Sequence, residues 1–117
     1  MTYIVDSSEI EERGAGFMFR VLRDDRIWPA FVIRFDGRAI AYLNVCAHVG
    51  LRLNGDKNQF FDREAKLLFC TAHGASYEPI SGQCVSGPCM NYGLISLKIH
   101  ERDGSIYYQD EVYKLVE

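Results

Sequence analysis

The stretch "CTAHGASYEP" (residues 70–79) places a cysteine and a histidine three positions apart and follows the histidine directly with a glycine. A second stretch, "CAHVGLRLN" (residues 46–54), is nearly the same, with one residue fewer between the pair and the glycine two positions after the histidine. Each pair comes at the end of an apolar run, where a strand is expected to give way to a loop. The two pairs are separated by 21 residues, and they predict that two loop tips meet at one metal centre.

The candidate ligands are two cysteines and two histidines, one of each from either loop. Thiolate and imidazole groups suit zinc or an iron–sulfur cluster. Structural zinc sites usually pair like ligands within one loop, so zinc is the less specific interpretation. The mixed pairs favour a cluster in which one iron takes both cysteines and the other iron takes both histidines. The four ligands would be Cys46, His48, Cys70 and His73.

This choice of ligands changes the charge of a two-iron cluster. Two ferric ions and two sulfides carry a total charge of roughly +2. Four thiolate ligands would bring the total to about −2, whereas two thiolates and two neutral imidazoles would bring it to about zero. Adding an electron to a neutral site costs less, so the reduction potential rises relative to an all-cysteine cluster. Histidine ligands can also release protons, which couples the reduction potential to pH.

Around the two loops the sequence consists of short apolar or alternating runs broken by turn signals, which predicts an all-β domain. Asp36-Gly37 and Asp103-Gly104 each lie between two such runs and indicate hairpins. The best helix candidate is a single turn at residues 7–12, capped by Ser7 or Ser8. The expected strands are residues 16–22, 29–35, 38–45, 65–70, 94–101 and 105–110.

Between Val45 and Leu94 the pattern changes. This segment holds six of the ten glycines, all four cysteines and two of the three prolines, and its regular apolar spacing mostly disappears. This pattern predicts a loop-rich insertion on a β scaffold, and functional residues commonly lie in such loops. We expect residues 1–117 to form one domain, with the insertion at about residues 45–91.

Composition limits the classes of partner. The net charge of −3 provides no basic surface, so nucleic acid is not expected as a partner. No apolar run approaches the roughly 18 residues that cross a bilayer, so no membrane association is expected either. The N-terminus lacks a charged start followed by an apolar stretch, and the expected compartment is the cytoplasm. Cysteines there more often serve metal or redox chemistry than a disulfide framework.

Cys-x-His, the spacer, Cys-x-x-His-Gly and the later "SGPC" (residues 86–89) resemble the pattern of Rieske iron–sulfur proteins. The resemblance covers essentially the whole chain. It implies a Rieske-type antiparallel β-sandwich or barrel with a loop-rich cluster-binding subdomain. It also implies one 2Fe–2S cluster, with Cys46 and Cys70 on one iron, and His48 and His73 on the other iron near the surface.

The resemblance further implies that Gly74, Tyr77 and Pro88 support the cluster. Relatives place a serine and a tyrosine as donors to sulfur after the second histidine, where this chain has Ala75 and Tyr77. Fewer donors stabilise the reduced cluster less, so we expect a potential in the lower half of the range of about −150 to +300 mV. Simple aromatic packing is the alternative role for Tyr77. The spacer is longer than in oxygenase ferredoxins, and residues 55–64 are expected to form an extra loop.

Cys84 and Cys89 lie outside the ligand pattern. They are open to three interpretations: two small, semi-buried thiols, a mutual disulfide that closes the loop, or a regulatory redox pair. The sequence alone does not choose among them.

The resemblance implies a soluble one-electron carrier that works between a reductase and an acceptor such as an oxygenase. The chain would then be a component of an oxidoreductase and not a stand-alone catalyst. A mononuclear iron site needs two further histidines, and only His100 remains, on the polar face of a strand. The alternatives are a small Rieske subunit of a larger oxidoreductase complex, a redox-sensing module, and a zinc-stabilised interaction module.

Overall fold

Antiparallel strands make up nearly all regular structure in this computed structural model, which describes residues 1–45, 53, 58–70, 74–87 and 92–116. A 3-10 turn, η1 (Ser7–Glu9), is the one helical element among those residues, and no helix there could cross a membrane. The predicted all-β class is confirmed. The strands are β1 (Thr2–Asp6), β2 (Phe17–Arg23), β3 (Arg26–Phe35), β4 (Arg38–Leu43), β5 (Leu68–Phe69), β6 (Ser76–Tyr77), β7 (Cys84–Ser86), β8 (Ser96–Leu97), β9 (Ile99–Arg102), β10 (Ser105–Tyr108) and β11 (Lys114–Leu115).

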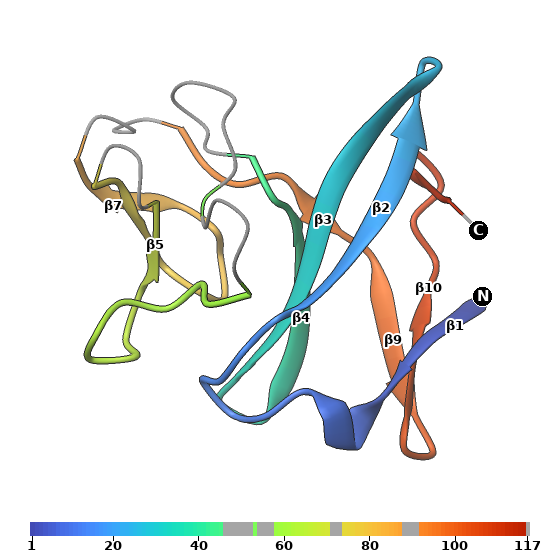
Figure 1. The fold of residues 1–117 in the computed structure, drawn as a ribbon, viewed down its shortest axis with the longest axis horizontal. Helices are drawn as coiled ribbons and strands as arrows, with labels where there is room; N and C mark the ends of the chain where they lie inside the picture. The colour runs from blue at the N-terminus through green and yellow to red at the C-terminus, as the bar shows by residue number, and fades with distance from the viewer. Residues whose placement is uncertain (46–52, 54–57, 71–73, 88–91, 117) are drawn as a thin grey trace.

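These strands form three sheets in which all neighbours run antiparallel. The largest sheet has the order β11-β2-β3-β4-β8, the second β1-β10-β9, and the third β5-β6-β7. Figure 1 shows the third sheet on one side of the long β3–β4 hairpin and the β1-β10-β9 sheet on the other. Side chains of the first two sheets share one apolar core, which confirms the predicted sandwich.

The hairpin of β3 and β4 is a middle layer with a core on each face. Alternate side chains of a strand point to opposite faces. Phe31 and Ile33 belong to the core that contains residues of the third sheet, whereas Ala30 and Val32 belong to the core beneath the second sheet. This double burial explains the unbroken apolar run at residues 30–33, all of which are 0% exposed.

The Asp-Gly signals mark two of the tight turns. Asp36-Gly37 has φ values of +53° and +77°, and Asp103-Gly104 has +50° and +78°, so both residues of each turn are left-handed. Both predicted hairpins are confirmed. The turn between β2 and β3 has the same conformation at Asp24-Asp25, with φ values of +53° and +62°, although it contains no glycine. Aspartate tolerates this region well enough to replace glycine there.

Two local predictions were wrong in detail. The residue that caps η1 is Asp6, which makes no side-chain capping bond, and the cap is neither Ser7 nor Ser8. The strand expected over residues 65–70 is confined to β5. The Asp62 carboxylate accepts the backbone N–H of Lys66 at 3.1 Å, which holds this stretch in a turn instead of a strand.

Phe60 anchors the described part of the predicted extra loop on the scaffold. Its ring is fully buried and stacks on Phe31 with a centroid distance of 3.9 Å. Gly16 makes room for the ring, because a Cβ atom there would lie 2.6 Å from it. The Gly16 N–H also donates to the Asn58 carbonyl at 2.7 Å. This part of the loop is therefore packed against the start of β2.

Arg34 joins three segments of the scaffold. Its guanidinium donates to Glu101 of β9 at 2.6 Å, to the Ile10 carbonyl at 2.8 Å and to the Gly37 carbonyl at 3.1 Å. The side chains of Arg34 and Glu101 are only 15% and 30% exposed. The hydrogen bond from Arg34 lowers the pKa of the Glu101 carboxyl.

We predict that Glu101→Gln removes part of the acid sensitivity of folding. Because the folded-state pKa of Glu101 is lowered, its ion pair stabilises the fold above the unfolded value of about 4.3. That contribution, about 0.5–1 kcal/mol, is lost as the pH falls through the folded-state pKa. Urea midpoints between about pH 6 and pH 3 should therefore fall less in Glu101→Gln than in the wild type.

Glu64→Gln is the matched control for this prediction. Glu64 pairs with Lys66 at 3.5 Å, but both side chains are at least 70% exposed. Such a pair contributes little, so this variant should follow the wild-type pH dependence. A Glu101→Gln curve parallel to that of the wild type would contradict the prediction.

Candidate metal centre

Cys70 follows β5 directly, and its side chain is fully buried in the core that also holds Phe31 and Tyr77. Gly74 and Tyr77, two of the residues predicted to support the centre, are also described, and His100 is exposed as expected. The other predicted residues lie outside the described part of the chain: Cys46, His48, His73, Pro88 and Cys89.

The backbone closes the turn that follows Cys70. The Cys70 N–H donates to the Ala75 carbonyl at 2.8 Å, and the Gly74 N–H donates to the Cys70 carbonyl at 2.9 Å. Gly74 has φ of +72°, a conformation that glycine adopts without strain. β5 and β6 pair on either side, so the ends of the Cys-x-x-His stretch are fixed to each other.

Gly87 brings a third segment onto this turn. A Cβ atom at Gly87 would lie 2.9 Å from the Ala75 Cα and 3.0 Å from the Gly74 carbonyl oxygen. Its φ of +89° also favours glycine. Sequence reasoning selected Pro88 from the Gly-Pro pair and missed Gly87, although the same motif "SGPC" (residues 86–89) contains both.

Tyr42 connects the third sheet to β4 of the middle layer. Its buried hydroxyl donates to the Pro79 carbonyl at 2.7 Å and the Ile80 carbonyl at 2.9 Å, and burial raises the pKa of Tyr42. Gly82 is required beside it, because a Cβ atom there would lie 2.7 Å from the ring. The turn before β7 is therefore held in place by a side chain from the scaffold.

Asn44 connects the two ends of the first predicted ligand loop. It is 1% exposed, and its Oδ1 atom accepts the backbone N–H of Leu53 at 3.0 Å. Leu53 is itself fully buried. Sequence reasoning missed this residue, although it is the one amide side chain in the run "AYLNV" (residues 41–45).

Two other sequence interpretations concern the core around Cys70. Tyr77 is fully buried there, as expected of a packed aromatic, and its role as a donor to sulfur stays a prediction. Cys84 is 7% exposed and disulfide-bonded. The interpretation of Cys84 as a separate, semi-buried thiol is therefore wrong. The predicted partner, Cys89, lies outside the described residues.

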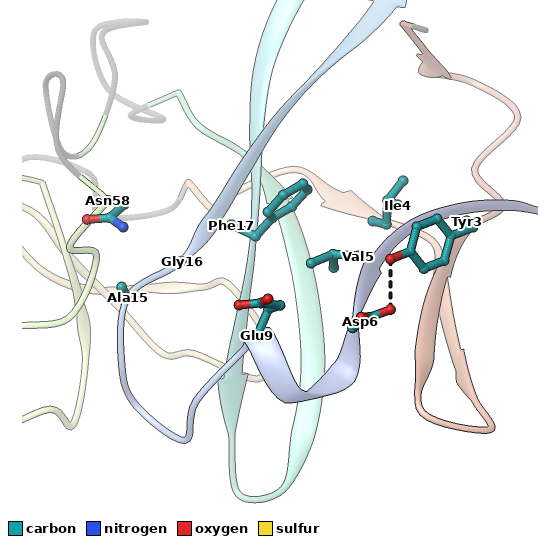
Figure 2. A pocket seen from close by; sticks show the side chains of 9 residues that line it. All are labelled: Tyr3, Ile4, Val5, Asp6, Glu9, Ala15, Gly16, Phe17 and Asn58. Carbon is teal, nitrogen blue, oxygen red and sulfur yellow. Dashed lines mark hydrogen bonds between the residues drawn. The ribbon is translucent and has the colours of Figure 1, made fainter.

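A hollow of about 350 Å³ lies away from these residues, between β1, η1 and the start of β2. Figure 2 shows the carboxylates of Asp6 and Glu9 at its edge, with the Tyr3 hydroxyl donating to Asp6 at 2.7 Å. That hydrogen bond raises the pKa of Tyr3. Cys70, the predicted ligand that the structure describes, does not line this hollow.

The described scaffold is all-β and buries the Cys70 thiol, a soft group of the kind that binds metal, at a glycine-containing turn. The chain belongs to the Rieske [2Fe-2S] domain family, whose pattern matches residues 1–101. The predicted family is thereby confirmed, and membership implies one Rieske 2Fe–2S cluster. No match exists among curated protein sequences.

Solved structures with this fold include Rieske ferredoxins. The ferredoxin of carbazole 1,9a-dioxygenase from Nocardioides aromaticivorans IC177 is 17% identical, with a TM-score of 0.72 over 94% of this chain and 97% of that chain. The Sphingomonas yanoikuyae B1 ferredoxin is also 17% identical, with a TM-score of 0.66 over 93% and 96% of the two chains. A chain from the complex of reduced oxygenase and oxidized ferredoxin in carbazole 1,9a-dioxygenase is 21% identical, with a TM-score of 0.66 over 92% and 99%.

The described residues fit such a cluster. Cys70 offers a soft thiolate ligand from a turn whose backbone is fixed by two hydrogen bonds. Gly87 allows two backbone segments to approach more closely than a side chain would permit, and Gly74 adopts a positive φ that glycine tolerates. The surrounding apolar side chains limit access of water, which is one way a protein tunes a reduction potential.

We predict that Gly87→Ala destabilises the fold more than Gly104→Ala. Both glycines have positive φ values, +89° and +78°, so alanine strains the backbone at either position by about 1–2 kcal/mol. At Gly87 the new methyl group also overlaps the backbone of Ala75, which adds about 1–3 kcal/mol, whereas nothing lies within 4 Å at Gly104.

Urea denaturation of the two variants measures this difference. Hydrogen exchange over residues 68–77 should increase in Gly87→Ala only, because the added methyl group displaces the segment that covers this turn. Equal losses of stability in the two variants, with unchanged exchange over residues 68–77, would contradict the assigned contact.

Proposed function

We propose that this chain is a one-electron carrier of the Rieske ferredoxin type. The observation that carries the proposal is the Rieske match over residues 1–101, which include both Cys/His motifs. The similarity to stand-alone ferredoxins supports it, since the alignment covers nearly the whole of both chains. One domain over residues 1–117, with a cluster-binding subdomain at about 45–91, is part of the proposal.

We assign the ligands from the two motifs, with two cysteines on one iron and two histidines on the other. When bound, the cluster supplies a site that gains and loses a single electron. The chain's own residues position the ligands and exclude water. Cys70 is held by the closed turn after β5, and the aromatic side chains of the surrounding core form an apolar wall. The assigned ligands are Cys46, His48, Cys70 and His73, with Gly74, Tyr77 and Pro88 in support.

An oxygenase is the acceptor that we propose, with a reductase as the donor. Solved structures with this fold include complexes between oxygenase and ferredoxin in carbazole 1,9a-dioxygenase. A carrier of this kind needs only a transient contact with each partner, and such contacts are small. We infer a cytoplasmic location for this exchange from the composition of the sequence.

Metal analysis together with EPR spectroscopy tests the proposed function. The purified protein should contain two irons and two acid-labile sulfides per chain, in line with a [2Fe-2S] domain. After reduction it should give the rhombic EPR signal of a cluster with mixed histidine and cysteine ligands. Its reduction potential should fall as the pH rises, because deprotonated histidine ligands disfavour the added electron.

Two variants serve as internal comparisons. Cys70→Ser should abolish the EPR signal, since it removes a thiolate ligand. His100→Ala should leave iron content and potential unchanged, because His100 is exposed on β9. A colourless protein that contains zinc and no sulfide would overturn the carrier proposal and favour a structural module.

We infer further that the partner of the disulfide-bonded Cys84 is Cys89. Cys46 and Cys70 are assigned to the cluster, which leaves one cysteine of the four. Disulfides are uncommon in the cytoplasm, so this disulfide is not the state expected in the compartment that we infer. Free thiols are alkylated at the moment of cell lysis, and the protein is then mapped as peptides without reduction. This mapping should recover a linked Cys84–Cys89 peptide. Alkylation of both residues in that sample would contradict the pairing inside the cell.

A further inference from the structure

Three segments carry the predicted ligands and the Gly-Pro motif, and the described contacts join the ends of each segment in one of two ways. Described backbone groups join the ends of the turn after Cys70, where the Cys70 N–H donates to the Ala75 carbonyl at 2.8 Å. Backbone groups also join the ends of the third segment, where the Cys84 N–H donates to the Tyr92 carbonyl at 3.0 Å. The first segment differs, because the described bond between its ends uses a side chain.

That side chain is Asn44, which the scaffold places firmly. The Asn44 N–H donates to the Pro29 carbonyl of β3 at 2.8 Å, and the preceding Leu43 N–H donates to the Ile95 carbonyl at 3.0 Å. The amide therefore extends from a backbone that is bonded on both sides. Its Oδ1 atom lies 3.0 Å from the Leu53 nitrogen, nine residues further along the chain.

Burial makes this bond hard to replace. Asn44 is 1% exposed and Leu53 is 0% exposed, so water has little access to the Leu53 N–H. A buried backbone N–H without an acceptor is strongly disfavoured. Loss of the Asn44 carbonyl would therefore displace the Leu53 backbone, which follows the segment that carries Cys46 and His48.

We propose that Asn44 is a positioning residue that sets the placement of the first ligand segment and thereby controls retention and reduction potential of the cluster. Asn44 acts through Leu53 and is not itself a ligand. This inference rests on the proposed function, since it takes Cys46 and His48 as ligands. Groups that orient metal ligands commonly change metal retention by about 10- to 100-fold when they are removed.

Three variants isolate the hydrogen bond. Asn44→Leu keeps a similar side-chain size but removes the acceptor, whereas Asn44→Asp keeps an acceptor at the same place. Tyr108→Phe is the control for general loss of stability, because it removes another buried hydrogen bond, from the Tyr108 hydroxyl to the Tyr113 carbonyl at 2.5 Å. Tyr108 lies in the core of the scaffold that does not contain Cys70.

The first measurement is the loss of visible absorption of the holo-protein in the presence of an iron chelator, below the unfolding transition. Asn44→Leu should lose its cluster about 10- to 100-fold faster than the wild type, with altered EPR g-values and a shifted potential. Asn44→Asp should retain the cluster at close to the wild-type rate, because a carboxyl oxygen can still accept the Leu53 N–H. Tyr108→Phe should unfold at a lower temperature but keep the wild-type rate, potential and g-values.

The second measurement is hydrogen exchange at the Leu53 amide, which needs no cluster. Exchange should be slow in the wild type and in Asn44→Asp and fast in Asn44→Leu. If Asn44→Leu does not fold, Asn44→Ser replaces it, because the shorter side chain withdraws the acceptor with less steric change.

Wild-type retention and wild-type potential in Asn44→Leu, or equal cluster loss in Asn44→Leu and Tyr108→Phe, would overturn the inference. A wild-type protein without iron would instead contradict the proposed function, and Leu53 exchange would still report whether Asn44 holds the segment.

Discussion

The structure depends on a hairpin that is buried on both faces. β3 and β4 contribute Phe31 and Ile33 to one core, and Ala30 and Val32 to the other. Each side chain of the run at residues 30–33 is 0% exposed, so a shift of register by one residue would exchange the two sets of side chains. The same layer therefore fixes the scaffold on one side and the position of the third sheet on the other.

Different residues in or next to this layer contact the different segments near the proposed centre. Tyr42 of β4 holds the turn before β7, and Asn44, just after β4, holds Leu53. Phe31 of β3 stacks on Phe60, which leads towards β5 and Cys70. Leu53, Phe60 and the turn before β7 are thus attached individually to the β3–β4 hairpin or to the residue that follows it.

Local signals in the sequence predicted the class of fold, the two Asp-Gly hairpins and the Rieske family. These features depend on neighbouring residues, such as a left-handed turn at Asp36-Gly37 or alternation along a strand. The contacts that hold the centre together were missed because they join distant positions. Asn44 meets Leu53, and Gly87 meets Ala75, only once the chain has folded. Residue type alone does not reveal such pairs, since an asparagine beside apolar residues also fits a loop.

The manner in which the turns are closed suits a carrier better than a sensor. A sensor needs two arrangements of similar free energy that the redox state can exchange. Around Cys70 the described backbone groups are bonded to each other, and Gly87 lies against the Ala75 backbone without room for a methyl group. In the carrier proposed above, a turn held in this way would change little when the cluster gains an electron, so electron uptake would require little rearrangement of the protein. Tight closure therefore favours repeated one-electron exchange, whereas a signal would require the turn to open.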